Sequence, residues 1–172
     1  MDPSEKQELL TLLDAGRDAF LHAVAGVADD IAAVSPGVGS WSVLQCVEHV
    51  AMAEDYMLLQ VSKATHSEAP VVNKGRESAI KKKGADRTKP VESPDVGKPT
   101  GRFLSLTEGV EHFLACRTRT IHLLQTCEDL RAMLTDHPII GRVNCHEMLL
   151  MMAVHPHRHA KQIHEIKDAL VE

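Results

Sequence analysis

Histidine is the residue type in this chain with the clearest capacity for chemistry. The sequence contains 11 histidines, and eight of them lie between His112 and His164. Neutral imidazole rings are good ligands for zinc, nickel and iron, and two rings one helical turn apart can bind the same ion. His155 and His159 have this spacing. The first question is therefore which histidines face the interior of the protein.

The segment around His155 and His159 has the periodicity of an α-helix. Each residue of a helix advances the direction by about 100°, so positions three, four, seven and eleven apart share a face. The face that holds both rings is otherwise apolar, and an unpaired buried imidazole nitrogen costs roughly 1–3 kcal/mol. A shared metal ion would explain the pair. By the same rule the opposite side, which we expect to face solvent, holds His146, His157 and His164.

Pro156 lies directly after His155 and complicates this prediction. Proline removes a backbone donor and disfavours helical geometry at the residue before it. Two alternatives stay open at this point. Either the helix kinks and turns His155 toward an ion, or the segment is irregular and the spacing to His159 is lost.

A third ligand must come from another helix, and His49 is the candidate. It lies three residues after Cys46, at the edge of an apolar stripe. Three neutral imidazoles are a well-attested donor set for zinc and also suit nickel or iron. The alternative is a boundary histidine bonded to Glu48 or to solvent. Cys46 is a rival ligand, although a free cysteine usually behaves as a small buried hydrophobe.

Four amphipathic segments could position these histidines. The pattern predicts helices over about 4–34, 43–63, 106–127 and 144–170. Ser42 with Gln45, and Asn144 with Glu147, have the spacing of helix-capping pairs. Because no segment shows a convincing strand pattern, we expect an all-α four-helix bundle that occupies the whole chain, 1–172, as one domain.

Residues 66–104 form a long predicted connection between the second and third helices. The stretch is rich in proline and glycine, and we expect one short helix around Glu77 to Lys82. Between Val71 and Phe103 it carries nine basic and four acidic residues. A solvated loop is one interpretation, and a lid or a site for an anionic ligand is the other, since long loops in small domains are often functional.

Composition limits the remaining functional classes. The formal net charge is −5, and the basic run has no interleaved aromatic residues, so nucleic-acid binding is not expected. The N-terminus lacks the pattern of a signal peptide, and no apolar run has the length of a membrane span. The four cysteines lie far apart without a CxxC pair. We therefore expect a cytoplasmic protein that does not interact with membranes.

Three motifs together resemble the DinB/YfiT-like superfamily of small bacterial metal-binding bundles. Trp41-Ser42 is followed by His49, His137-Pro138 precedes Gly141, and His155-x-x-x-His159 is followed by Gln162-Ile163. The resemblance implies an up-down-down-up bundle, frequent homodimers, and one divalent ion, usually zinc or nickel, with water in its open positions. Its three histidine ligands correspond here to His49, His155 and His159.

We expect a small-molecule substrate, and three hypotheses for function stay open. Some characterised relatives are transferases that use a low-molecular-weight thiol, which favours a metal-dependent thiol transferase using a thiol such as bacillithiol or mycothiol. The second hypothesis is a metal-dependent hydrolase, with Glu48 or Glu54 as the candidate base. The third is a non-catalytic metal-binding or stress-response protein.

Overall fold

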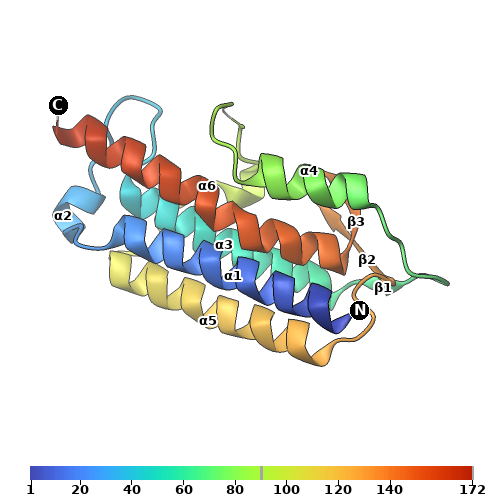
Figure 1. The fold of residues 1–172 in the computed structure, drawn as a ribbon. Helices are drawn as coiled ribbons and strands as arrows, with labels where there is room; N and C mark the ends of the chain where they lie inside the picture. Colours follow the sequence, from blue (N-terminus) through green and yellow to red (C-terminus); the bar gives the residue numbers. More distant parts are fainter. Residues whose placement is uncertain (90, 172) are drawn as a thin grey trace.

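Four long helices lie side by side and make up most of the structure, a computed structural model that describes residues 1–89 and 91–171 (Figure 1). α1 and α6 run in one direction while α3 and α5 run in the other, so the order is up-down-down-up. The predicted four-helix bundle is confirmed. Residue 90, in the predicted connection, lies outside the described residues. The four helices are α1 (Pro3–Val24), α3 (Val43–Ser62), α5 (Leu106–Thr126) and α6 (Cys145–Val171).

The first helix is shorter than the sequence predicts. It ends at Val24, and a separate short helix, α2, spans Asp29–Ala32. Gly26 has φ of 74°, a left-handed conformation that commonly ends a helix. The predicted continuation to residue 34 was therefore wrong. Ile31, which matched the helical period, is 49% exposed.

Side-chain caps define the starts of the helices that carry the candidate ligands. Ser42 Oγ accepts a hydrogen bond from the Gln45 amide, and Gln45 Oε1 accepts one from the Ser42 amide. Asn144 and Glu147 make the same reciprocal pair before α6. Both predicted capping pairs are confirmed. They fix where α3 and α6 begin, and therefore the direction in which each later side chain points.

α6 runs without interruption through Pro156. A proline at this position cannot donate to the carbonyl of Met152, four residues earlier. The buried guanidinium of Arg117 on α5 donates to that oxygen instead, at 2.8 Å. The same guanidinium pairs with Glu54 on α3 and donates to the carbonyl of Leu13 on α1. Arg117 therefore bonds to the other three helices of the bundle and satisfies the group that the proline leaves unpaired.

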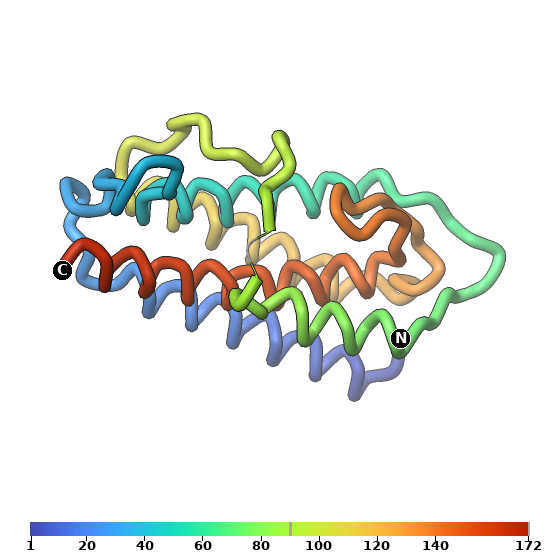
Figure 2. The backbone as a smooth tube through the Cα atoms, turned by 90° about the horizontal axis from the view of Figure 1, so that it is seen from above, coloured from blue at the N-terminus to red at the C-terminus, as the bar shows by residue number. Residues whose placement is uncertain are grey.

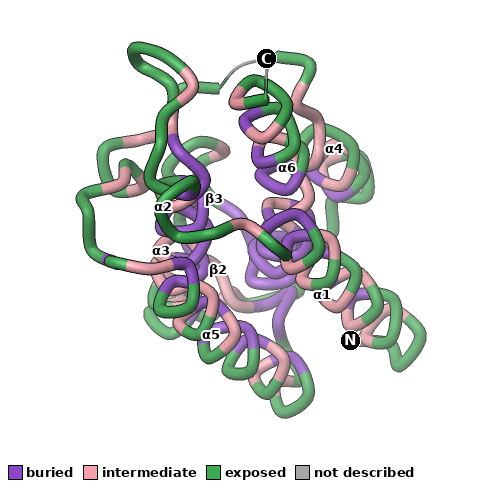
Figure 3. Tube along the Cα trace, turned by 90° about the vertical axis from the view of Figure 1, so that its left-hand side faces the viewer, coloured by how far each residue is buried: buried purple, intermediate pink, exposed green. Residues whose placement is uncertain are grey.

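The space between the helices is filled mainly by aliphatic and methionine side chains, as predicted. Figure 3 shows the buried residues on the inward sides of the helices. α1 and α6 approach closely at Gly16, where a Cβ atom would lie 2.2 Å from the carbonyl oxygen of Ala153. Among the described residues, no helix has the length and apolarity needed to cross a membrane.

A small antiparallel sheet covers one end of the bundle. Its strands are β1 (Thr65–His66), β2 (Met133–His137) and β3 (Gly141–Asn144), in the order β1-β2-β3. The sequence shows no convincing strand pattern, and this sheet is a small addition to the confirmed all-α bundle. The strands are two to five residues long, too short for an alternating pattern to be recognised.

Parts of the connection between α3 and α5 pack against the bundle, although most of its described residues are exposed. It contains α4 (Lys74–Gly84), which lies along α6, and a short 3-10 helix, η1 (Asp95–Gly97), which contacts α3. The chain therefore crosses from α6 to α3 between them (Figure 2). α4 includes the short helix that the sequence predicts and is longer at both ends. Interpretation of the whole stretch as a solvated loop was wrong.

Candidate metal centre

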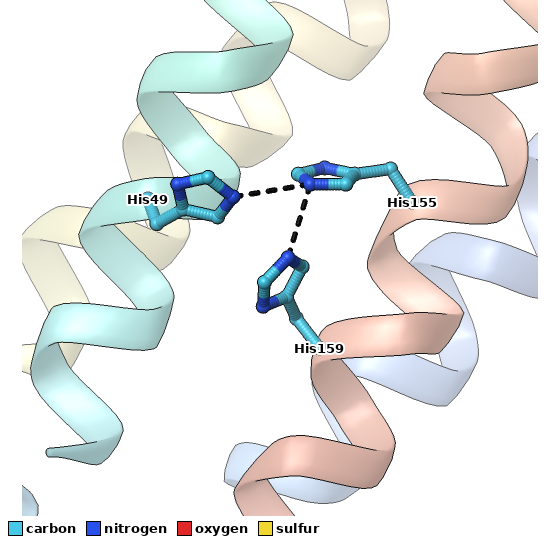
Figure 4. Close-up of side chains that lie close together, drawn as sticks. All are labelled: His49, His155 and His159. Carbon is cyan, nitrogen blue, oxygen red and sulfur yellow. Dashed lines mark hydrogen bonds between the residues drawn. The ribbon is translucent and has the colours of Figure 1, made fainter. Parts of the chain in front are cut away.

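Three imidazole rings meet between α3 and α6 (Figure 4). The Nε2 atom of His155 lies 3.1 Å from Nε2 of His49 and 3.0 Å from Nε2 of His159. One ligand atom from each ring lies within 4.8 Å of the other two. The structure thus brings together all three histidines that we predicted as candidate ligands from the sequence. Because α6 is unbroken at Pro156, the one-turn spacing of His155 and His159 is kept.

Two of the rings are oriented by hydrogen bonds from their outer nitrogens. His49 Nδ1 lies 2.5 Å from the carbonyl oxygen of Gly97 in η1, and His159 Nδ1 lies 2.9 Å from Oε1 of Gln162. Since both partners are acceptors, each Nδ1 carries the proton and each Nε2 presents a lone pair. Neither Gly97 nor the partner role of Gln162 was predicted, although Gln162 belongs to one of the three sequence motifs.

The donor set fits a divalent cation. His155 Nε2 can carry at most one proton, so it can satisfy only one of the two lone pairs that face it, from His49 and His159. One buried lone pair is then left without a partner. A single cation at the meeting point would accept all three nitrogens, with outer hydrogen bonds of the kind that metal-binding histidines usually make.

Electrostatics keep the rings neutral, which is the form that binds metal. Burial lowers the pKa of His49, and it lowers the pKa values of His155 and His159 well below the ordinary histidine value. The positive charge of Arg158 acts in the same direction on all three rings, as a smaller effect. At neutral pH the rings are therefore available as donors without first losing a proton.

The three rings line one side of a cavity of about 750 Å³. Its walls come from α3, α4, α6, the chain around η1, and the turn after β2. A cavity of this volume is in the range that holds small-molecule ligands. Apolar surface predominates in the lining, which also includes the charged residues Arg76, Lys83, Arg87, Glu92, Arg158 and Glu165. Apolar lining residues include Trp41, Met57, Ile80, Val96, Ile139 and Met151.

His137 also lines this cavity, outside the group of three. It is the last residue of β2, and its Nδ1 accepts a hydrogen bond from the Ile139 amide at 3.1 Å. Burial lowers its pKa to about 4. The His137-Pro138 motif therefore belongs to the wall of the cavity, where a neutral imidazole faces the same space as the three clustered rings.

The other candidates from the sequence have different roles. Cys46 is fully buried, and burial raises the pKa of its thiol to about 12, so it packs as a small hydrophobe. Both oxygens of Glu48 accept hydrogen bonds from the backbone amides of Thr100 and Gly101. Glu54 is held by Arg117. Neither carboxylate is available as the base that hydrolysis would use.

The prediction for His146 was wrong. It is buried at the side of α6 that α4 covers, with Nε2 3.4 Å from an Arg131 nitrogen. His164 is exposed as expected, and His157 is half-buried. Helical periodicity separates the two sides of α6 correctly, but it does not reveal that the connection after α3 folds back over the second side.

Comparisons with known proteins agree with this architecture. The chain matches the family model of the DinB superfamily over residues 12–163. It is similar to YfiT from Bacillus subtilis, described as a probable metal-dependent hydrolase with an unusual four-helix bundle topology. The two share 18% identity with a TM-score of 0.66, over 99% of this chain and 90% of YfiT.

A second solved structure has the same overall shape. It is TT2238, described as a four-helix bundle protein, at 19% identity and a TM-score of 0.62, over 93% of this chain and 98% of TT2238. At such identities the likeness shows the fold alone. Comparison with proteins of curated function finds no match.

Proposed function

The chain belongs to the DinB superfamily, and from this membership and the geometry of its clustered histidines we propose that it is a metal-dependent transferase of small thiols. His49, His155 and His159 would hold one divalent ion, zinc or nickel. The acceptor would be a small electrophile bound in the adjoining cavity. The thiol would be a low-molecular-weight one such as bacillithiol or mycothiol.

The observation that carries this proposal is the meeting of three neutral imidazole nitrogens at the wall of a 750 Å³ cavity. Three protein ligands are the usual number at a catalytic zinc site, because a position remains for a reactant. A divalent cation held there would supply the Lewis acidity that lowers the pKa of a thiol and makes it nucleophilic at neutral pH.

Residues of this chain would prepare the site for that reaction. The Gly97 carbonyl and Gln162 hold two of the rings in the required tautomer and direction. Trp41 packs beside His49, with ring centroids 4.9 Å apart, and contributes an apolar surface to the cavity. A cavity of this volume would hold an acceptor beside a thiol, and its apolar walls would limit the access of water.

The engagement of Glu48 and Glu54 favours thiol transfer over hydrolysis. A hydrolase of the predicted kind would use a free carboxylate to assist water, and both candidates are bound by other groups. A coordinated thiol is acidified by the ion itself and needs no side-chain base. The engagement of these two carboxylates therefore supports thiol transfer over hydrolysis assisted by Glu48 or Glu54.

The test is turnover of a haloaromatic acceptor in the presence of a small thiol. Metal-loaded protein should accelerate the reaction, and His155→Ala should return the rate to the uncatalysed level. His164→Ala, an exposed histidine on the same helix, is the matched control and should retain full activity. Equal rates for the unaltered protein and His155→Ala would reject the proposal.

Two other functions stay as alternatives, and parallel turnover assays separate them from thiol transfer. Metal-dependent hydrolysis is suggested by the description of YfiT, and it would give turnover of an ester or amide without added thiol. A non-catalytic metal-binding or stress-response protein would bind the ion and turn over neither acceptor. We also propose, from the family resemblance, a cytoplasmic homodimer, which light scattering of the purified protein tests for oligomeric state.

A further inference from the structure

One buried arginine in the wall of the cavity has no acidic partner. Arg158 lies on α6 between His157 and the candidate ligand His159, is 9% exposed, and lines the cavity. Its Nη2 donates to the carbonyl oxygen of Lys89 at 3.0 Å. Within the described part of the chain, no carboxylate forms an ion pair with it.

The other arginines near the cavity are neutralised. Arg87 pairs with Glu165 at 3.0 Å, and Arg76 pairs with the buried Glu147 at 2.7 Å. Asp86 and Glu165 act on the charge of Arg158 only from a distance. Arg158 therefore differs from its neighbours, since most of its five donors are left for a group inside the cavity.

Burying a guanidinium with a single carbonyl partner is costly unless something else compensates the charge. A purely structural role does not explain why this residue is charged, because an uncharged side chain could make the one hydrogen bond to Lys89. Its charge reaches all three clustered rings, whose pKa values it lowers after the larger effect of burial. An anion held by Arg158 would lie close to the candidate metal centre.

We propose that Arg158 is the anion-binding residue of the cavity, and that the reactant bound there is a small organic carboxylate with an apolar body. Arginine binds carboxylates through two parallel hydrogen bonds, which fixes the orientation of the bound molecule as well as its affinity. The apolar walls would receive the remainder of the reactant. This inference rests on the proposed function, because it assigns a reactant to the same site.

The inference also revises the sequence-based expectation of an anion site in the connection. Among the basic residues of that stretch, the ones that form ion pairs with carboxylates are Lys74, Arg76, Lys81, Arg87 and Lys98. The connection contributes a wall and a carbonyl acceptor for Arg158. It also contributes Lys83, which lines the cavity but is exposed to solvent. The buried positive charge that remains to be compensated comes from α6.

Binding can be measured directly from Trp41, which is the single tryptophan of the chain and lines the cavity. The probes are 3-phenylpropionate and its neutral amide, titrated against tryptophan emission. We expect the carboxylate to bind at least about tenfold more tightly than the amide, since charge-assisted hydrogen bonds are roughly twice as strong as neutral ones. Arg158→Gln should abolish this preference, and Arg158→Lys should keep part of it.

Two controls separate Arg158 from other positive groups. Arg87→Gln removes a cavity arginine that already has a carboxylate partner, and it should keep the full preference. Titrations of metal-loaded and metal-stripped protein separate binding by Arg158 from binding by the ion. Circular dichroism and metal uptake should be the same for Arg158→Gln and the unaltered protein.

Three results would overturn the proposal: equal affinity for acid and amide, a preference that survives Arg158→Gln, or a preference that disappears when the metal is removed. A second pair, 3-mercaptopropionate and 3-mercaptopropionamide, tells which reactant carries the anion. Preference in this pair too assigns the anion to the thiol, and preference confined to the phenyl pair assigns it to the acceptor. Binding is read without turnover, so failure of the thiol-transfer assay would not affect this result.

Discussion

The geometry of the three clustered histidines depends on residues outside the group of candidate ligands. His49 is directed by a backbone carbonyl of η1, and His159 by a side chain one turn further along α6. A Cβ atom at Gly97 would lie 3.2 Å from Cε1 of His49, so the acceptor and the ring are in close contact. The position of the rings therefore depends on the connection as well as on the two helices.

His137 gives a testable acid sensitivity. Burial lowers its pKa to about 4 in the folded protein, whereas the unfolded chain has the ordinary value of about 6.5. As pH falls through this window the unfolded state binds a proton that the folded state does not, so stability present above the window is lost. At about pH 5 the loss is on the order of 2 kcal/mol.

The measurement is urea unfolding of metal-stripped protein at about pH 7 and about pH 5. His137→Gln should reduce the difference in unfolding free energy between the two values by on the order of 2 kcal/mol. The exposed His66→Gln serves as the control. An unchanged difference in His137→Gln would show that the ring is not kept neutral by its surroundings.

The sequence alone predicted the burial of some site residues and not of others. The inward direction of His155 and His159 followed from helical periodicity, because their neighbours on that face are apolar. Arg158 could not be recognised in this way. It lies beside the predicted stripe, where a charged residue is expected to face solvent. Its low exposure and its contact with Lys89 show in the structure that it is covered.

At the scale of elements, the connection between α3 and α5 determines what is buried. α4 covers one side of α6 and buries His146, while η1 and the chain before it form a wall of the cavity. Periodicity within one helix reports an apolar stripe, but it does not report which other segment packs against the remaining surface. For this physical reason the three clustered histidines were predicted, whereas the segments that pack over α6 and the cavity were not.

The backbone hydrogen bond that Pro156 cannot make leads to a prediction about helix packing. Arg117 pairs with Glu54 and donates to the Met152 carbonyl, so Arg117→Met leaves a buried carboxylate and a carbonyl without partners. Removing one member of a buried ion pair typically costs about 3–5 kcal/mol. We expect a loss of this size in the unfolding free energy, measured by urea titration.

The carbonyl contribution can be isolated with a second substitution. Pro156→Ala restores a backbone donor to Met152, so it should recover about 1 kcal/mol in the Arg117→Met background. The same change in the otherwise unaltered protein should give a smaller gain, because Arg117 already fills that role. Identical effects in both backgrounds would show that the arginine and the proline are not coupled.

For the molecule as a whole, the fold and the cavity at the candidate site depend on different features of the sequence. The bundle follows from four long amphipathic segments with recognisable caps, which is why its class could be predicted. The cavity joins residues from Pro36 to Ile166 and includes parts of the connection, so no local pattern describes it. Its volume and lining appear only once the segments are packed together.

Because the fold does not depend on the residues of the candidate site, we can predict how the protein responds to metal removal. Two clusters of buried apolar residues stabilise the bundle without any contribution from an ion, so chelation should leave the helical circular dichroism signal unchanged.

Metal that binds only to the folded state adds about 2.7 kcal/mol to the free energy of unfolding at a free metal concentration about 100 times the dissociation constant. For a chain of this length, zinc should therefore raise the thermal midpoint by roughly 5–10 °C. His155→Ala should show no such rise, whereas His164→Ala should show all of it. Loss of helical signal on chelation would mean that the ion is part of the fold, as in small zinc domains, rather than a ligand of a preformed site.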